Sequence, residues 1–290
     1  MARGCLKKYY WKYVENIEPI RQSSSLAIGN VVHDCFEMFY KGSSDEECLK
    51  HIVDTFDEEI SKSELSDQEE LLISKYNAMG MWKFYPHKDL SAFEAILPEM
   101  SFRVRLGRSR DYLVGRMDGY VIKDRTPWIR EVKTTGLSEG QFRGRMATSG
   151  QATCYVYAAN KLKSMPPPAG VMFDVIRKSS LRKKQTETAD EFGKRIYNDY
   201  RLRPDEHYYR HYEYRNPERV RLWEADMIDL CKDLRKRHRT NQWHRNTEQC
   251  WSFNAECPYL KVCFSEKPDP LTLELLYKGG SYGEGKGSEV

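Results

Sequence analysis

Hydrophobic positions in the first quarter of the chain recur every three or four residues, which is the period of amphipathic helices. Four helices are predicted there, at residues 3–14, 26–42, 44–62 and 66–84. Ser25 can cap the second of them. Residues 16–24, with a proline and a run of serines, read as a loop. The first part of the chain is therefore expected to be mainly helical.

The pattern then changes to the two-residue alternation of β-strands. Three such runs are predicted, at 98–106, 111–123 and 127–134. The segment KDRTP between the last two reads as a tight turn, so these strands are expected to be antiparallel neighbours. A long helix over 140–162 and an apolar run over 170–178, suited to a buried strand, come next. This order predicts a mixed α/β sheet core.

From residue 177 the chain becomes basic and aromatic. RKSSLRKK at 177–184 reads as a solvated loop, DEHYYRHYEYR at 205–215 as a strand, and 218–238 as a long amphipathic helix. The Gly-rich segment from 266 is predicted to be disordered. These runs and RKRHRTNQWHR at 235–245 interleave cations with aromatic rings. The cations attract phosphates, and the rings can stack on unpaired bases. The alternative is a solvated helix face with strand aromatics packed in the core.

Composition narrows the class of protein. The 290 residues are 40% hydrophobic and 31% charged, their mean hydropathy is −0.75, and no stretch approaches the roughly 18 apolar residues of a membrane span. The N-terminus lacks the apolar region of a secretory signal, so we expect a cytoplasmic protein, in the host cell if a phage encodes it. A net charge of +4 permits nucleic-acid binding without demanding it. Eight cysteines in a reducing compartment favour metal binding or redox chemistry over disulfides.

The strongest chemical pattern is GRMDGY followed by REVKTT. Asp118 lies on one predicted strand, and Glu131 and Lys133, two residues apart, share a face of the next, with Val132 pointing the other way. Antiparallel pairing brings Asp118 opposite Glu131. Two carboxylates beside an ammonium group suit Mg²⁺, with Lys133 orienting or activating water and neutralising phosphate charge. The alternative is an ordinary cross-strand salt bridge.

The surroundings of this triplet favour a functional site. Gln151 and Tyr155, four residues apart, share one face of the following helix. His33 lies upstream, on an apolar helix. Taken singly, His33 can be a buried, hydrogen-bonded histidine, and Tyr155 can be part of the core.

The motifs GRMDGY, EVK and GQATCYVY, preceded by GNVVHDCFE, resemble those of PD-(D/E)XK nucleases, specifically the RecB-like branch. The resemblance runs over about residues 25–160 in the expected order. It implies that Mg²⁺ or Mn²⁺ is bound by His33, Asp118, Glu131 and the carbonyl of Val132. It also implies that Lys133 serves catalysis and that Gln151 and Tyr155 position the strand or support the metal shell.

A second pattern lies near the C-terminus, in QCWSFNAECPYLKVCF. Cys250, Cys257 and Cys263 cluster there, and Cys5 stands far away in RGCLKKYYWKYV. Four thiolates suit a 4Fe-4S cluster or structural zinc. RecB-like nucleases related to the CRISPR-associated exonuclease and to AddB hold such a cluster with one N-terminal and three C-terminal cysteines.

The spacing of these cysteines agrees with that branch only in part. Five residues separate Cys257 from Cys263, as in the family, but six separate Cys250 from Cys257 where the family usually has two. The alternatives are free buried thiols, zinc bound with His238 or His244, and loop cysteines without a ligand at Cys250 and Cys257. The remaining cysteines read as buried thiols on helix faces: Cys35, Cys48, Cys154 and Cys231.

Together these patterns predict a restriction-endonuclease-like α/β fold with a mixed sheet flanked by helices. We expect one RecB-like nuclease domain over 1–265, ahead of a tail at 266–290. Its parts are a helical region at 1–90, a nuclease core at 91–180, and a basic region with the cysteine cluster at 181–265. The resemblance implies a metal-dependent exonuclease acting on single-stranded DNA ends in recombination, repair, phage or CRISPR processing, with protein partners in recombination or CRISPR adaptation. The alternative is a nucleic-acid-binding or recruitment protein on a nuclease fold with little or no turnover.

Overall fold

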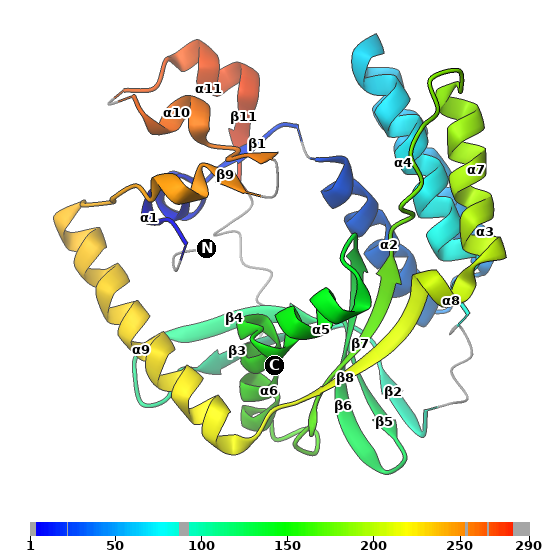
Figure 1. The fold of residues 1–290 in the computed structure, drawn as a ribbon. Helices are drawn as coiled ribbons and strands as arrows, with labels where there is room; N and C mark the ends of the chain where they lie inside the picture. The colour runs from blue at the N-terminus through cyan, green and yellow to red at the C-terminus, as the bar shows by residue number, and fades with distance from the viewer. Residues whose placement is uncertain (1–3, 22, 87–92, 253–254, 266, 281–290) are drawn as a thin grey trace. The chain divides into compact units, whose positions relative to one another are not determined.

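The computed structural model describes residues 4–21, 23–86, 93–252, 255–265 and 267–280 (Figure 1). The chain forms two compact units, Ser23–Ala225 and a second one made of Met1–Gln22 with Asp226–Val290. The domain predicted over 1–265 includes all of the larger unit and most of the smaller one. No helix in the described part of the chain combines the length and the apolar character that crossing a membrane requires.

The larger unit contains a five-stranded sheet in the order β2-β5-β6-β7-β8. Its strands are β2 Ala95–Leu97, β5 Gly119–Lys123, β6 Thr126–Thr135, β7 Gly170–Arg177 and β8 Tyr208–Tyr214. Only β6 and β7 are parallel, and the other neighbours are antiparallel. A mixed sheet flanked by helices is the predicted fold class, which the structure confirms (Figure 1).

The predicted turn KDRTP joins β5 to β6 as a two-residue hairpin. Asp124 and Arg125 have φ angles of 51° and 60°. Positive φ at both central residues is the type I′ geometry, whose twist matches that of the flanking strands. The register of β5 and β6 is therefore fixed locally, by the turn.

The predicted strand at 111–123 is two strands, interrupted at Asp118. Its first half, β4 Tyr112–Met117, pairs antiparallel with β3 Met100–Arg105 in a separate two-stranded sheet. The Asp118 carboxylate accepts the Val132 N–H at 2.9 Å, a donor that would otherwise serve the backbone of a paired strand. At this position the side chain takes the place of a backbone acceptor, and the strand pairing changes from β3 before Asp118 to β6 after it.

The parallel connection from β6 to β7 is made by helices. The sequence predicts one helix over 140–162, but the structure has α5 Glu139–Ala147 and α6 Gly150–Lys161. The hydroxyl of Ser149 accepts the N–H of Ala152 at 3.2 Å and starts the second helix as its N-cap. The prediction of a single helix was wrong because Ser149 caps a new helix at a point where the hydrophobic pattern continues.

Four helices pack together on the sheet in one apolar core. They are α2 Ser24–Tyr40, α3 Asp45–Lys62, α4 Leu65–Lys83 and α7 Ala189–Leu202. The cap of α2 is Ser23, not Ser25 as predicted, since the Ser23 hydroxyl accepts the N–H of Leu26. Helix α7 was missed, although Thr188 and Glu191 form a capping box at its start.

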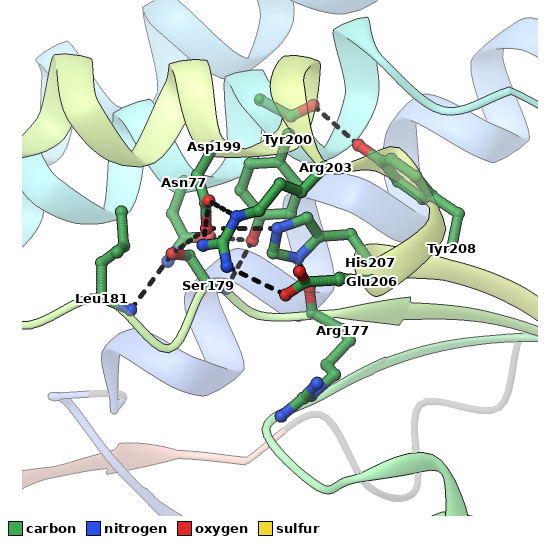
Figure 2. A network of polar contacts seen from close by, with 11 residues as sticks. Asn77, Arg177, Ser179, Leu181, Asp199, Tyr200, Arg203, Glu206, His207 and Tyr208 are labelled. Carbon is green, nitrogen blue, oxygen red and sulfur yellow. Dashed lines mark hydrogen bonds and ion pairs between the residues drawn. The ribbon is translucent and has the colours of Figure 1, made fainter.

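A buried polar network ties the end of β7 to α7 and to α8, Pro204–His207 (Figure 2). The Asp199 carboxylate accepts from Ser179 Oγ at 2.6 Å and from Arg203 Nε at 2.7 Å, and lies 3.2 Å from His207 Nε2. Burial opposes ionisation of Asp199, but these groups outweigh it and lower its pKa. The serine donates to the aspartate rather than to the histidine, so the arrangement holds the fold together and is not a nucleophilic triad.

The smaller unit joins both ends of the chain. Its elements are α1 Leu6–Tyr9, the π-helical turn Tyr10–Val14, β1 Ile17–Pro19, the 3₁₀ turn Thr247–Gln249, β9 Trp251–Ser252, β10 Ala255–Glu256, α10 Leu260–Cys263, α11 Pro270–Leu276 and β11 Tyr277–Gly279. Helix α9, Pro217–Thr240, contains the boundary between the units.

Two predictions about this unit need correction. Strand β1 lies in the predicted loop at 16–24 and pairs with β11. Helix α11 and β11 lie in the predicted disordered tail, although residues 266 and 281–290 of that tail lie outside the described residues.

Candidate active site

The β5–β6 hairpin sets the centre of the candidate site. Gly119 pairs with Arg130, so Asp118 lies opposite Glu131 just beyond the last pair. Lys133 lies on the Glu131 side of β6, and its Nζ is 2.5 Å from Glu131 Oε1. The structure therefore places the three predicted catalytic side chains together.

Helix α2 brings the predicted histidine to the same point. His33 Nδ1 lies 3.3 Å from Asp118 Oδ2, the oxygen that also accepts the Val132 N–H. The residue Val132 lines the cleft, while its fully buried side chain belongs to the apolar core.

Helix α6 supplies the remaining predicted side chains. Gln151 Nε2 donates to Glu131 Oε1 at 2.9 Å and to the hydroxyl oxygen of Tyr155 at 2.8 Å. Tyr155 is 9% exposed, and its ring packs edge-on against Phe102. Tyr155 is thus part of the apolar packing, which was the alternative to a role in the site. Its hydroxyl also belongs to the row of hydrogen bonds that runs through Gln151 to Glu131.

All these residues line one cleft of about 510 Å³ in the larger unit. The cleft wall also contains charged and amide side chains that the sequence patterns did not indicate: Asn30, Asp34, Glu37, Glu99 and Arg116. A signal for two of them existed, because Asn30 and Glu37 stand three residues before and four residues after His33 on one helix face. Glu99 and Arg116, which pair at 2.8 Å, had no such signal.

The two carboxylates of the cleft differ in acidity. Burial, and then the charge of Asp118, raise the pKa of Glu131 to about 7 against the pull of Lys133. Burial also opposes ionisation of Asp118, but the hydrogen bond and charge of His33, with the Val132 N–H and Lys133, lower its pKa. Carboxylates whose pKa values are pushed apart are typical of functional sites.

One oxygen of the cleft is left without a partner. Glu131 Oε2 is buried and accepts no hydrogen bond from the described residues. A buried carboxylate oxygen that is ionised is stable only when a cation pairs with it. Carboxylate and carbonyl oxygens together with an imidazole are suitable ligands for Mg²⁺ or Mn²⁺. Within the described residues, no group of three or more His, Cys, Asp or Glu side chains is placed so that it could hold a metal ion. The chemistry of the donor set suits a divalent cation, whereas its present arrangement does not form a metal site.

The four clustered cysteines meet in the smaller unit. Cys5, Cys250, Cys257 and Cys263 all line one small cavity of about 10 Å³. The six residues between Cys250 and Cys257 contain β9 and β10, which pair as a hairpin and return the chain, and the Cys257 N–H donates to the Cys250 carbonyl at 2.7 Å. The unusual spacing is therefore compatible with two adjacent thiols.

The surroundings of this cavity are basic. Arg245 lines it and donates a hydrogen bond to the backbone carbonyl of Cys263 at 2.8 Å, and the Asn246 N–H lies 3.4 Å from Cys5 Sγ. Neither His238 nor His244 lines the cavity, so the described residues give no support to a mixed cysteine–histidine zinc site. Of the four cysteines expected to be buried, Cys35 and Cys48 are buried, whereas Cys154 and Cys231 are only half-buried.

The basic and aromatic strand predicted at 205–215 is mostly structural. Arg210 pairs with the fully buried Asp174 at 2.6 Å, as does Arg130 at 2.7 Å. Arg215 is buried and donates to Glu213 and Thr153. These three cations therefore pair with groups of the same unit and hold its sheet together.

Comparison with known proteins agrees with this geometry. A sequence model of the PD-(D/E)XK nuclease superfamily matches residues 2–264, nearly the whole chain. A comparison with curated proteins gives no match. The match runs through both motifs of the cleft and through the mixed sheet that carries them, and on this ground the chain belongs to the PD-(D/E)XK nuclease superfamily.

Proposed function

We propose that this protein hydrolyses phosphodiester bonds of DNA with Mg²⁺ or Mn²⁺, as an exonuclease on single-stranded ends. The observation that carries the proposal is the cleft in which His33, Asp118, Glu131 and Lys133 converge around a buried carboxylate oxygen without a partner. The RecB-like branch, the exonuclease mode and the single-stranded substrate are supported by the resemblance of the motifs.

The residues of the cleft divide the chemistry among them. His33, Asp118, Glu131 and the Val132 carbonyl would hold the ion, which when bound supplies Lewis-acid stabilisation of the phosphate charge and a more acidic water. Lys133, 27% exposed, reaches the cleft beside Glu131, where it can orient the attacking water and neutralise phosphate oxygens.

Helix α6 supports this arrangement from behind. Gln151 donates to Glu131 Oε1 and so fixes the orientation of the carboxylate, whose Oε2 has no hydrogen-bond partner among the described residues and would be the oxygen that binds the ion. Supporting hydrogen bonds of this kind tune the affinity and geometry of metal sites. Gln151 is accordingly a positioning residue in the proposal, with Tyr155 next to it in the same chain of hydrogen bonds.

Cleavage of end-labelled single strands with Mn²⁺ or Mg²⁺ tests the proposal. We expect wild-type protein to cleave, and Lys133→Ala and Asp118→Ala to lose activity while Lys50→Ala, on the exposed side of α3, keeps it. Circular single strands should resist cleavage if the enzyme needs an end. Undiminished cleavage by the two cleft variants would refute the site. Strand binding by wild type without any turnover would favour the binding or recruitment protein instead.

We also propose that Cys5, Cys250, Cys257 and Cys263 hold a 4Fe-4S cluster. Their common cavity and the cation next to Cys263 support an anionic thiolate centre. Such a centre would join the N-terminal helix to the C-terminal segment and need not take part in hydrolysis.

Anaerobic purification separates the cluster from zinc. A brown protein with broad absorbance near roughly 400 nm, lost in Cys263→Ser but kept in Cys154→Ser, is expected for the cluster. A colourless protein with one zinc per chain would refute the cluster and leave the thiolate site standing.

A further inference from the structure

The hairpin of β3 and β4 carries a concentration of positive charge that neither the fold nor the catalytic motifs account for. Residues 100–117 contain five arginines and one aspartate, a net charge of +4, which equals the net charge of all 290 residues. No lysine occurs among these residues. We call this hairpin the β3–β4 ribbon.

One face of the ribbon is packed against the rest of the unit. Phe102, Val104 and Met117 are buried, and the Phe102 ring meets Tyr155 of α6. At Gly115 a Cβ atom would come within 2.6 Å of the Phe102 ring, so the glycine lets that ring lie across the strand. The inner face therefore anchors the ribbon next to the cleft and fixes which side chains point outwards.

The other face is exposed and of unusual composition. Cross-strand pairs on it join Arg103 to Val114 and Arg105 to Tyr112. Val114 is 74% exposed and Tyr112 is 52% exposed, and the Arg103 guanidinium lies 4.6 Å from the centre of the Tyr112 ring. Exposed arginines are enough to keep an edge strand soluble, so solubility does not explain the exposed ring of Tyr112.

Most arginines of the ribbon form no ion pair within the described part of the protein. Arg105 donates to the carbonyl of Ser109 in the turn, and so closes the hairpin. Arg103, Arg108 and Arg110 are exposed, and none of them pairs with a carboxylate of the residues that the structure describes. Their guanidinium groups are therefore available to an anion from outside.

The ribbon leads directly into the cleft. Strand β4 ends at Met117, and the next residue is Asp118. Arg116, the last outward-facing residue of β4, lines the cleft with Glu99. A chain bound along the outer face of the ribbon would therefore continue to the catalytic carboxylates.

We infer that the outer face of the β3–β4 ribbon binds single-stranded DNA, with Arg103, Arg108 and Arg110 on its phosphates and Tyr112 stacked on an unpaired base. The inference rests on the proposed nuclease function for its substrate. Guanidinium groups form paired hydrogen bonds with phosphate oxygens, and an exposed ring offers a stacking surface that a paired base cannot use.

Binding measured in EDTA, where no hydrolysis occurs, tests the inference by fluorescence anisotropy of a labelled single strand. The variant Arg103→Ala/Arg108→Ala/Arg110→Ala is compared with Lys50→Ala/Lys83→Ala/Arg201→Ala, which removes the same charge from exposed positions on α3, α4 and α7. Each lost contact to a single strand lowers the salt slope by about 0.7, so three should lower it by about 2 and weaken binding about fiftyfold at 0.15 M salt. The control should retain the wild-type slope.

The stacking part has its own pair of variants. Tyr112→Phe should bind like wild type, and Tyr112→Leu should bind at least about fivefold more weakly. Equal affinity and salt slope in the arginine variant and its control would overturn the ribbon as a binding surface. Tighter binding of a duplex of the same length, unaffected by Tyr112→Leu, would overturn the single-stranded ligand.

The outcome for the ribbon is independent of the outcome for catalysis. Weakened binding by the ribbon variants in a protein that never cleaves with Mn²⁺ would uphold the ribbon and refute the nuclease. Normal cleavage by wild type, together with unchanged binding by the ribbon variants, would uphold the nuclease and refute the ribbon.

Discussion

Replacing Glu131 by glutamine tests whether the buried, ionised Glu131 carboxylate lowers the free energy of unfolding of the protein. The side chain is 1% exposed, and its Oε2 has no hydrogen-bond partner among the described residues. Glutamine keeps the shape and resembles the protonated acid. We expect Glu131→Gln to abolish metal-dependent cleavage and yet to stabilise the metal-free protein at pH 8.

The magnitude follows from the pKa of Glu131, which burial and the nearby Asp118 raise from 4.5 to about 7. A carboxyl whose folded pKa is raised binds its proton more tightly in the folded state, so stability falls as the pH rises from the unfolded to the folded pKa. At about 1.4 kcal/mol for each tenfold change, the ionised carboxylate costs about 3 kcal/mol at pH 8. Below pH 5 the cost falls under about 1 kcal/mol.

Urea unfolding in EDTA at pH 8 and pH 5 measures this difference. Glu131→Gln should exceed wild type by about 3 kcal/mol at pH 8, and the gap should nearly close at pH 5. The control Glu70→Gln, on the exposed face of α4, should match wild type at both values of pH. A Glu131→Gln protein that is no more stable than wild type at pH 8 would refute the reasoning.

Three further outcomes are expected. Because an ion needs the ionised form of Glu131, Mn²⁺ affinity measured by calorimetry should be about tenfold weaker at pH 6 than at pH 8; an affinity unchanged over this range would contradict the raised pKa. Asp199→Asn should lower the free energy of unfolding by about 3 kcal/mol at pH 7, since it breaks a buried network. The lowered pKa of Asp199 means that this loss shrinks as the pH falls below about 4, so an equal loss in acid would count against the network. Gly193→Ala should destabilise by about 1–3 kcal/mol, because its Cβ would lie 2.1 Å from the Tyr76 ring, whereas Gly144→Ala, with open space around it, should be neutral or stabilising in thermal unfolding.

Much of the candidate site could be expected from local rules. The alternation of β6 puts Glu131 and Lys133 on one face, and the two-residue turn fixes Asp118 opposite Glu131. Helical spacing alone puts Gln151 and Tyr155 on one side of α6. These relations extend over a few residues or one hairpin, so backbone geometry is enough to specify them.

Other features were missed for two different reasons. The split between α5 and α6 and the presence of α7 had capping residues as local signals, which the hydrophobic pattern concealed. The pairing of β1 with β11 joins residues about 260 positions apart, and nothing within either segment specifies its partner. The interruption at Asp118 depends on the Val132 N–H, a side-chain contact within the hairpin that the alternation of apolar and polar residues does not reveal.

Local sequence patterns specify which side chains share a face, the class of the fold and the donor types of the cleft, because these follow from the period of the backbone and from side-chain chemistry. Long-range packing, in contrast, places His33 against Asp118, buries Glu131 deeply enough to shift its pKa, and leaves the arginines of the β3–β4 ribbon facing outwards. Burial and charge proximity are set by elements packed from distant parts of the chain. A residue's acidity and accessibility therefore appear only when the whole unit has folded.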